Sequence, residues 1–304
     1  MSRVVTVRAP AKINLSLRVL GVRPDGYHEL RTVFQSVALA DTLVFRTWDG
    51  PFRLTCDHPD VPRDGRNLVW LAAARLWAEL GRPGDPGGVS VSIRKRIPLQ
   101  AGLGGGSADA AAALAALARL WNARLPAAAL QRVAAGLGAD VPFMLSGGTA
   151  LGLGRGDEIH PLPDPPRRWV VVACPPFGVS TAEAYRWFDE PDVPAGAIRR
   201  AGDSARLAAA SWTDDLSQVA NDLESCVVRR HPVIGEAVAR LRAAGAAAAA
   251  MSGSGSAVFG LFIDAAGARR AVEPLAQPGW TVFVTRTLAG AEAAARLQPT
   301  DRDG

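Results

Sequence analysis

A run of glycines that leads straight into an alanine-rich segment constrains this chain more than any other part of its sequence. Residues 97–121 read IPLQAGLGGGSADAAAALAALARLW, with four glycines in the five positions 102–106. Glycine lets backbone N–H groups approach a ligand closely, and the N-terminus of a following helix carries partial positive charge. Both properties suit the oxygens of a phosphate group. The segment therefore predicts a phosphate-binding loop followed by a long helix.

Three kinds of phosphate loop compete for this segment. The Walker type requires Gly-Lys followed by Ser or Thr, a tripeptide that the chain lacks. The Rossmann type requires a buried strand before the loop and another strand after the helix. Here residues 89–94 alternate as in a half-exposed strand, and residues 126–137 predict a second helix. These features favour the third type, a loop entered from a half-exposed strand and backed by two helices, over a glycine turn that binds no ligand.

The composition is that of a globular chain with a sizeable core. Its 304 residues are 48% hydrophobic and 21% charged, which argues against disorder and allows one large domain or two. The net charge is +5, but the arginines are scattered, so nucleic-acid binding is not expected. No apolar run reaches the roughly 18 residues of a membrane span, and the N-terminus shows no signal segment. Cys56, Cys174 and Cys226 lack CxxC spacing, so we expect no zinc or disulfide framework, and a reducing cytoplasm.

Hydrophobic periodicity predicts alternating strands and helices. Strands are expected in roughly the first 60 residues, and a helix at residues 67–80. Residues 139–142, ADVP, are expected to be a loop, because proline disfavours helical geometry in the residue before it. Beyond a proline-rich linker the expected elements are a strand at 169–174, helical segments to about residue 244, strands at 246–251 and 257–263, a helix at 266–275 and a strand at 281–286.

Several short runs resemble known kinases. The run PLQAGLGGGSA, residues 98–108, resembles the ATP-binding motif of the GHMP kinases. More particular runs are similar to the 4-diphosphocytidyl-2-C-methyl-D-erythritol kinases within that superfamily: PAKINL at 10–15, RPDGYH at 23–28, GADVP at 138–142, PFGVST at 176–181, NDLE at 221–224 and MSGSGS at 251–256. The resemblance extends from about residue 8 to about residue 286, with departures at Gln100 and Ala108.

This resemblance implies an α+β, two-domain GHMP-kinase-like fold. Residues 1–163 would form an ATP-binding domain like domain 2 of ribosomal protein S5, and residues 164–304 an α/β sandwich that closes the substrate cleft. The implied reaction is ATP-dependent phosphorylation of the 2-hydroxyl of 4-diphosphocytidyl-2-C-methyl-D-erythritol, giving the 2-phosphate and ADP in non-mevalonate isoprenoid synthesis. A small-molecule substrate, Mg²⁺ beside ATP, and a monomer or homodimer without nucleic-acid or membrane partners are expected.

Catalytic roles follow from the same resemblance. Asp140 would take the proton of the 2-hydroxyl, and Lys12 beside it would stabilise charge on the transferring group. Of the 34 basic residues only Lys12 and Lys95 are lysines, which favours positions that need a compact ammonium group. Asn14, two residues after Lys12 on a strand, would position the substrate hydroxyl or Asp140. Each residue also has a purely structural alternative. Asp140 could cap a turn, Lys12 could be a solvated lysine on a strand, and Asn14 could form hydrogen bonds at a strand edge.

Binding roles complete the implied site. Tyr27 and His28 would hold the cytidine, with an ordinary surface histidine as the alternative for His28. Thr181 would lie on the substrate side or cap a helix, and Gly253 and Ser254 would line the same end of the cleft or form a simple turn. Ser107 has three open roles, as a helix cap, a phosphate contact or a magnesium ligand. The expected ATP-binding residues are Pro98, Ala101, Gly102, Leu103, Gly104, Gly105, Gly106, Ser107 and Ala108, with Asn67, also a plausible helix cap, and Lys95 towards the adenine and ribose.

Three other functions remain open at this point. Another GHMP kinase, of the homoserine or mevalonate type, would share the loop but need no cytidine pocket. A nucleotide-dependent binding protein without turnover would not need both Lys12 and Asp140. An RNA-binding protein is suggested only by the basic sequence pI of about 9.7, and no aromatic-rich RNA motif accompanies it.

Overall fold

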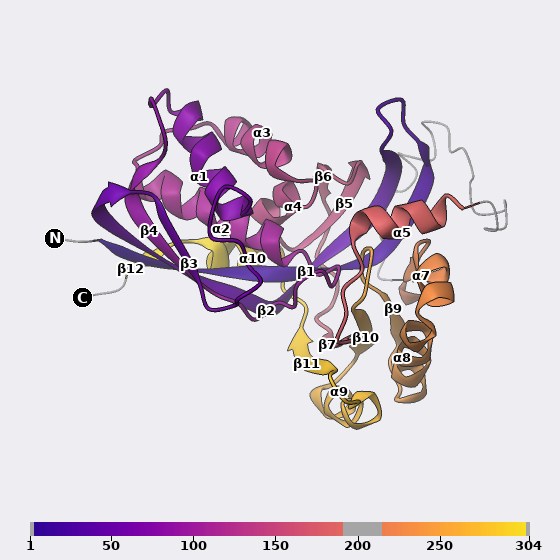
Figure 1. Ribbon diagram of the computed structural model, residues 1–304. Coiled ribbons are helices and arrows are strands. Elements are labelled where there is room, and N and C mark those ends of the chain that lie inside the picture. The colour runs from indigo at the N-terminus through magenta and orange to yellow at the C-terminus, as the bar shows by residue number, and fades with distance from the viewer. Residues whose placement is uncertain (1–2, 191–214, 302–304) are drawn as a thin grey trace.

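The computed structural model describes residues 3–190 and 215–301 of the chain. These residues form two sheets that lie side by side, each with helices packed against it (Figure 1). The mixed α+β architecture predicted from the sequence is confirmed. Residues 191–214, part of the stretch expected to be helical, lie outside the described residues.

The first sheet is built around two long strands, β1 (Val4–Val22) and β2 (His28–Pro51), which pair antiparallel over most of their lengths. Its shorter strands are β3 (Arg53–Cys56), β4 (Gly87–Arg94), β5 (Thr149–Gly154), β6 (Glu158–Pro161), β8 (Ala220–Asn221) and β12 (Thr300–Asp301). The strand order is β12-β1-β2-β4-β3, with β5 also on β2, β6 on β5, and β8 parallel to β1.

Five helices form a layer on one face of this sheet: α1 (Leu68–Glu79), α2 (Gly105–Leu120), α3 (Ala127–Leu137), α4 (Val141–Ser146) and α10 (Gly290–Leu297) (Figure 1). The helix α2 lies in the middle of the layer, against β1 and β2 and between the other helices. Six of its eight alanines are buried, and the other two, Ala115 and Ala118, are partly buried. Small side chains let neighbouring elements approach closely, which explains why the segment after the glycine loop is so rich in alanine.

The second sheet contains β7 (Trp169–Cys174), β9 (Ala248–Met251), β10 (Val258–Phe262) and β11 (Thr281–Arg286) in the antiparallel order β11-β7-β10-β9. The unbroken apolar run of β7 is buried on both faces, since Val170 and Val172 join the core of the first sheet whereas Val171 and Ala173 join a second core. The accompanying helices are α5 (Thr181–Phe188), α7 (Glu224–Arg230), α8 (Pro232–Ala243) and α9 (Ala265–Arg270), with short 3₁₀ turns at η1 (Leu216–Gln218) and η2 (Glu273–Leu275).

The two halves are joined by more than the linker. Strand β8, from the later half, pairs with β1, and both α10 and β12 pack against β1 from the far end of the chain. Strand β1 also contributes Leu17 and Val19 to the second core. The boundary at residues 163 and 164 stays a prediction.

The loop predicted at residues 139–142 is wrong in part. Helix α4 begins at Val141, with Pro142 in its first turn and Asp140 in helical geometry before it. Proline is tolerated there because the first N–H groups of a helix have no intrahelical partner. The preference of a residue before proline for extended geometry is therefore overridden at Val141.

Candidate active site

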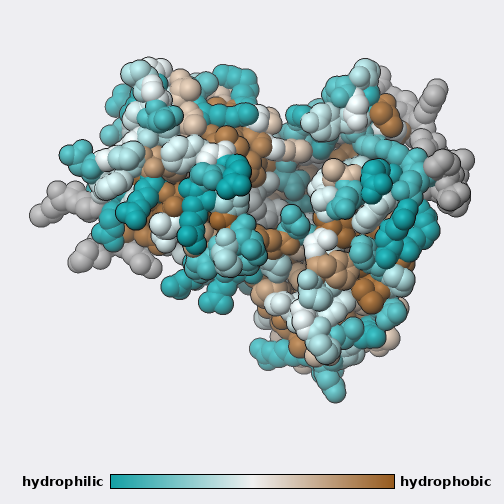
Figure 2. Space-filling view, in the orientation of Figure 1, coloured by the Kyte–Doolittle hydropathy of each residue, from teal (hydrophilic) through white to brown (hydrophobic). Residues whose placement is uncertain are grey.

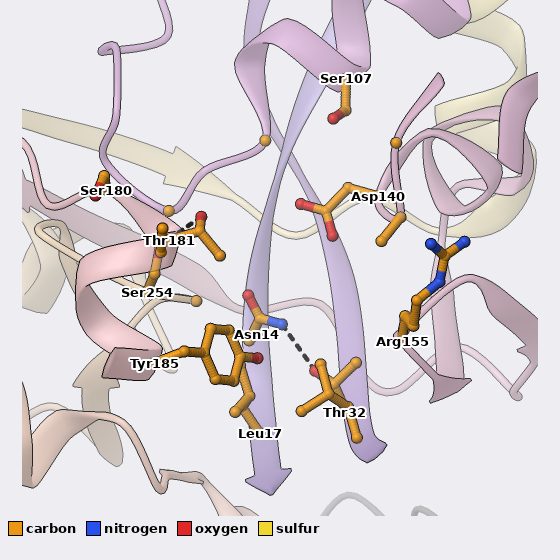
Figure 3. A pocket seen from close by; sticks show the side chains of 18 of the residues that line it. Asn14, Leu17, Thr32, Ser107, Asp140, Arg155, Ser180, Thr181, Tyr185 and Ser254 are labelled. Carbon is orange, nitrogen blue, oxygen red and sulfur yellow. Dashed lines mark hydrogen bonds between the residues drawn. The ribbon is translucent and has the colours of Figure 1, made fainter. Parts of the chain in front are cut away.

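A cavity of about 1410 Å³ lies where the start of α2, the start of α4, the strands β1 and β2, and helix α5 meet. Figure 2 shows the surface notched between the two parts of the molecule, and Figure 3 shows side chains from these elements converging on one space. Sixteen residues predicted from the sequence line the cavity: Lys12, Asn14, Tyr27, His28, Pro98, Ala101, Gly102, Leu103, Gly104, Gly105, Gly106, Ser107, Asp140, Thr181, Gly253 and Ser254. Asn67, Lys95 and Ala108 do not line it.

The glycine loop has the backbone geometry that its sequence requires. Gly104 caps the N-terminus of α2 in the left-handed region, at φ 71°. A Cβ atom there would lie 2.3 Å from the Met144 Cε and 3.1 Å from the Lys12 Cγ. A side chain at position 104 would therefore be strained by the left-handed backbone and would crowd Met144 and Lys12. Ser107 is the third residue of α2, so it does not cap the helix.

The second glycine-containing loop, MSGSGS at residues 251–256, packs directly on the first. The Ser252 Oγ donates to the Gly102 carbonyl oxygen at 3.0 Å, and the Ala257 N–H donates to the Ala101 carbonyl oxygen at 3.2 Å. A Cβ atom on Gly102, which has φ 72°, would lie 2.0 Å from the Ser252 carbonyl oxygen. The two loops thus hold each other, and Gly102 is the point where no side chain fits.

Replacing Gly102 by Ala is expected to destabilise the protein by about 2–4 kcal/mol, because left-handed strain and a clash with a backbone atom add together. The matched control is Gly81→Ala, because Gly81 has φ 67° but nothing within 4 Å of its added Cβ. It should lose only about 1–2 kcal/mol, from the strain alone. Denaturant unfolding measures both, and equal losses would show that the contact between the loops is not tight.

Lys12 and Asp140 both line the cavity and form an ion pair. The Lys12 Nζ lies 3.4 Å from the Asp140 Oδ2, 2.6 Å from the Asn14 Oδ1 and 5.5 Å from the centre of the Phe34 ring. The side chain of Lys12 is only 4% exposed, so it is not a solvated strand lysine. Asp140 stands at the cap position of α4, yet its side chain makes no capping hydrogen bond. Its carboxylate, 30% exposed, points into the cavity (Figure 3).

A short chain of hydrogen bonds fixes the amide of Asn14. Its Nδ2 donates to the Thr32 Oγ1 at 2.7 Å, and that hydroxyl donates to the Ser16 carbonyl oxygen at 2.7 Å. The Asn14 side chain is thereby oriented with its oxygen towards Lys12. These contacts lie on a buried face of β1 and β2, so the strand-edge alternative for Asn14 does not hold.

One end of the cavity, between the β1–β2 hairpin and α5, is lined by aromatic side chains and is called the aromatic end. Tyr27 is 57% exposed, and the Arg155 guanidinium lies 5.1 Å from the centre of its ring. The His28 ring stacks on Tyr185 at 4.6 Å. The Thr181 Oγ1 lies 3.2 Å from the Ser254 Oγ, and Ser180 caps α5 in place of Thr181.

Sequence reasoning missed several lining residues: Thr32, Arg155, Tyr185 and Asp189. Tyr185 had a signal, since the chain has only two tyrosines. Burial, and then the charge of Asp140, raises the pKa of the Tyr185 hydroxyl above its ordinary value. The other three reach the cavity only through the folding of distant segments together.

Lys95 lies behind the glycine loop in a buried cluster of charges. Its Nζ is 2.5 Å from the Asp41 Oδ2 and 2.7 Å from the Asp109 Oδ2, and it would lie 3.4 Å from a Cβ on Gly105. Burial raises the pKa of Asp109 to about 8, although the Lys95 ammonium lowers it. Burial acts to lower the pKa of Lys95, but the two carboxylates outweigh it and the net direction is upward. A pKa of about 8 keeps Asp109 largely protonated at neutral pH, so the Lys95 ammonium is shared by the Asp41 carboxylate and a mostly neutral Asp109 carboxyl group in a nearly dry site.

Asn67 caps helix α1, which is one of the two roles predicted for it. Its Oδ1 accepts from the Val69 N–H at 2.8 Å, and its Nδ2 donates to the Pro62 carbonyl oxygen at 2.7 Å. These bonds engage both ends of its amide and leave it at the start of α1. A contact with adenine stays a prediction.

Residues 3–190 and 215–301 contain no group of three or more His, Cys, Asp or Glu side chains placed to hold a metal ion. In the same ranges no helix has the length and apolar character needed to cross a bilayer. The cysteines Cys56, Cys174 and Cys226 are buried and unpaired.

Known proteins resemble this chain over most of its length. Residues 67–148 match the family "GHMP kinases N terminal domain", and residues 191–279 match "GHMP kinases C terminal". The 4-diphosphocytidyl-2-C-methyl-D-erythritol kinase of Moorella thermoacetica is 46% identical over 94% of this chain and 99% of its own, and that of Pelotomaculum thermopropionicum is 45% identical over 93% and 98%.

Solved structures give the same result. A crystal structure of 4-(cytidine 5'-diphospho)-2C-methyl-D-erythritol kinase, 39% identical, superposes with a TM-score of 0.73 and covers 93% of this chain and 98% of its own. The homoserine kinase of Cytophaga hutchinsonii also has a TM-score of 0.73, covering 98% of this chain and 97% of its own. At 21% identity that second likeness concerns the fold alone.

Proposed function

This chain belongs to the GHMP kinases and, within them, to the 4-diphosphocytidyl-2-C-methyl-D-erythritol kinases, and from this premise we propose the reaction that it catalyses. It transfers the γ-phosphoryl group of ATP to the 2-hydroxyl of 4-diphosphocytidyl-2-C-methyl-D-erythritol, giving the 2-phosphate and ADP. The reaction is a step of non-mevalonate isoprenoid precursor synthesis. The observation that carries the proposal is the Asp140 carboxylate, which makes no capping hydrogen bond and lies beside the buried Lys12 and close to the glycine loop.

The glycine cradle fits the phosphates of ATP. Gly104, Gly105 and Gly106 line the cavity at the N-terminus of α2, where N–H groups without helical partners and the helix dipole favour an anion. Because these glycines have no Cβ atoms, their backbone atoms form this part of the cavity wall. ATP supplies the phosphoryl group, and the Ser107 hydroxyl, which also lines the cavity, is the side chain proposed to contact a phosphate oxygen or Mg²⁺.

The transfer needs a base and a positive charge, and the cavity offers one of each. The substrate oxygen attacks the γ-phosphorus while the bond from that phosphorus to the β-phosphate oxygen breaks. The proton of the 2-hydroxyl passes to the Asp140 carboxylate. Lys12 balances the negative charge on the transferring group, and Asn14 keeps the Lys12 ammonium in place through its 2.6 Å hydrogen bond.

The aromatic end of the cavity is proposed to hold the cytidine. The exposed ring of Tyr27 offers a face on which a base can stack, and His28 offers a ring nitrogen to the edge of the base. Thr181, Gly253 and Ser254 would line the path between the base and the reacting hydroxyl. A monomer or homodimer in a reducing cytoplasm, consistent with the buried free cysteines, completes the proposal.

A coupled assay of ADP release tests the proposed substrate. With ATP and Mg²⁺, release is expected with 4-diphosphocytidyl-2-C-methyl-D-erythritol and not above background with homoserine or mevalonate. The physical reason is that only the first substrate fills the aromatic end of the cavity. Release with another alcohol alone would remove the cytidine from the proposal, and ATP binding without release from any of them would favour a non-catalytic protein.

A further inference from the structure

The segment NDLE, residues 221–224, is hydrogen-bonded to the second glycine-containing loop. The Asn221 Nδ2 donates to the carbonyl oxygens of Met251 at 2.9 Å and Gly253 at 2.7 Å. The Glu224 Oε2 accepts from the Met251 N–H at 2.8 Å. Asn221 is only 8% exposed, and none of the four residues of the segment lines the cavity. The segment therefore acts on this loop from outside the site.

The bonds of Asn221 use every part of its amide. A primary amide has two N–H donors and one acceptor oxygen. The two loop carbonyls take both donors, and the Asn221 Oδ1 accepts from the Leu223 N–H at 3.0 Å. An aspartate of the same shape has no donor and would place a carboxylate against two carbonyl oxygens. Position 221 therefore requires an amide, and that amide fixes the direction of two peptide groups in the loop.

The loop backbone held by Asn221 lies beside the Lys12 ammonium. A Cβ atom on Gly253, which lines the cavity with φ 56°, would lie 3.1 Å from the Lys12 Nζ and 3.3 Å from the Asn14 Oδ1. An ammonium has three donors, and a carbonyl oxygen is an acceptor. The Gly253 carbonyl could therefore bind Lys12 if its peptide group turned towards the cavity. Its bond to Asn221 prevents that rotation.

We propose that Asn221 is a positioning residue for phosphoryl transfer, which keeps the Gly253 carbonyl group off the Lys12 ammonium. The proposal rests on the function proposed above. It leaves the charge of Lys12 to Asp140, 3.4 Å away, and to the transferring group. If the Gly253 carbonyl were released, it would compete for the ammonium and draw it from this place. A misplacement of about 1 Å at a reacting centre can cost about 10²-fold in rate.

The adjacent residue Asp222 provides a matched control, because its bonds do not reach the second glycine-containing loop. Its Oδ1 accepts from the Arg18 Nη1 at 2.7 Å, and its Oδ2 accepts from the Val19 N–H at 3.0 Å. Neither Asp222 nor these two partners line the cavity. If the segment only stabilises the fold, Asn221→Ala and Asp222→Ala should both lower the melting temperature and leave the kcat of the folded protein unchanged.

The first test is the kcat of these variants, measured below the unfolding transition of each. In Asn221→Ala, kcat is expected to fall about 10- to 100-fold, with KM for ATP within about 3-fold of the wild type. Asp222→Ala should keep kcat within about 2-fold. Asn221→Ser retains one hydroxyl donor for the two carbonyls, so its kcat should fall less. It also replaces Asn221→Ala in every measurement if the alanine variant does not fold.

A second test observes the Lys12 side chain without turnover. Lys12 and Lys95 are the only lysines of the chain, so ¹³C-labelled lysine gives one Cε signal for each. A Lys12→Arg variant assigns the two signals. Asn221→Ala is expected to shift the Lys12 signal and leave the Lys95 signal in place, whereas Asp222→Ala should leave both. A loss of stability alone would not move the signal of one lysine selectively.

The outcomes separate this inference from the function on which it rests. A wild-type kcat in the Asn221 variants, or a lower kcat with an unmoved Lys12 signal, would overturn the inference and leave the proposed function standing. An equal fall of kcat in Asp222→Ala would also overturn it, since the effect would not depend on the loop. If the wild type releases no ADP with the cytidyl substrate, the proposed function fails and the catalytic role of Asn221 fails with it.

Discussion

An Asp140→Asn variant is expected to lose about 10²- to 10⁴-fold in kcat while it binds ATP as well as the wild type does. The amide has the shape of the carboxylate but cannot take the proton of the substrate hydroxyl. Asp140 makes no capping bond, so its replacement should leave the start of α4 intact. Steady-state ADP release measures kcat, and calorimetric titration measures ATP binding.

The control for this variant is Asp264→Asn. Asp264 caps α9 through a 2.7 Å bond from the Gly267 N–H, and an asparagine oxygen can accept the same bond. Its kcat should match the wild type. If Asp140→Asn kept kcat within about 3-fold of the wild type, proton removal by this carboxylate would not limit the reaction. Catalysis would then rest on Lys12 and the positioning of the two substrates.

The parts of the site that could be predicted from sequence are those set by local backbone demands. Gly102 and Gly104 adopt positive φ where a side chain would collide, and the run of glycines is the direct signature of that requirement. Lys12 and Asp140 came instead from a resemblance between short motifs. Taken alone in the sequence, neither residue can be told from a surface residue. Their 3.4 Å contact joins β1 to the start of α4, and only the fold brings these two segments together.

What the sequence did not reveal depends on the packing of distant segments. Strand β5 has all six residues buried, so its glycine-rich run shows no alternation to indicate a strand. Asp189 reaches His28 only because α5 folds over the hairpin. Lys95 was predicted to face ATP, but its partners Asp41 and Asp109 lie on β2 and α2, and no local pattern joins them to it.

A Lys95→Met variant is expected to lose about 3–5 kcal/mol of stability to unfolding, because the substitution leaves the buried Asp41 carboxylate without its ammonium and the Asp109 carboxyl group without its hydrogen-bond donor. Lys95 and Asp109 are 4% and 5% exposed, and Asp41 is fully buried. The Asp41 Oδ1 also accepts from the Arg96 and Ile97 N–H groups at 2.5 and 2.9 Å, directly before the glycine loop. Denaturant unfolding at neutral pH measures the loss.

The triple variant Lys95→Met/Asp41→Asn/Asp109→Asn distinguishes a charge effect from a packing effect. If the cost of Lys95→Met is that of unpaired charge, replacing both acids should recover much of it, since asparagine can still accept the two backbone N–H bonds at position 41. A direct role of Lys95 in binding ATP predicts the opposite pattern, with near-normal stability and a raised KM for ATP. Because the Lys95 ammonium lies behind Gly105, we expect the first pattern, in which Lys95 shapes the phosphate loop from behind.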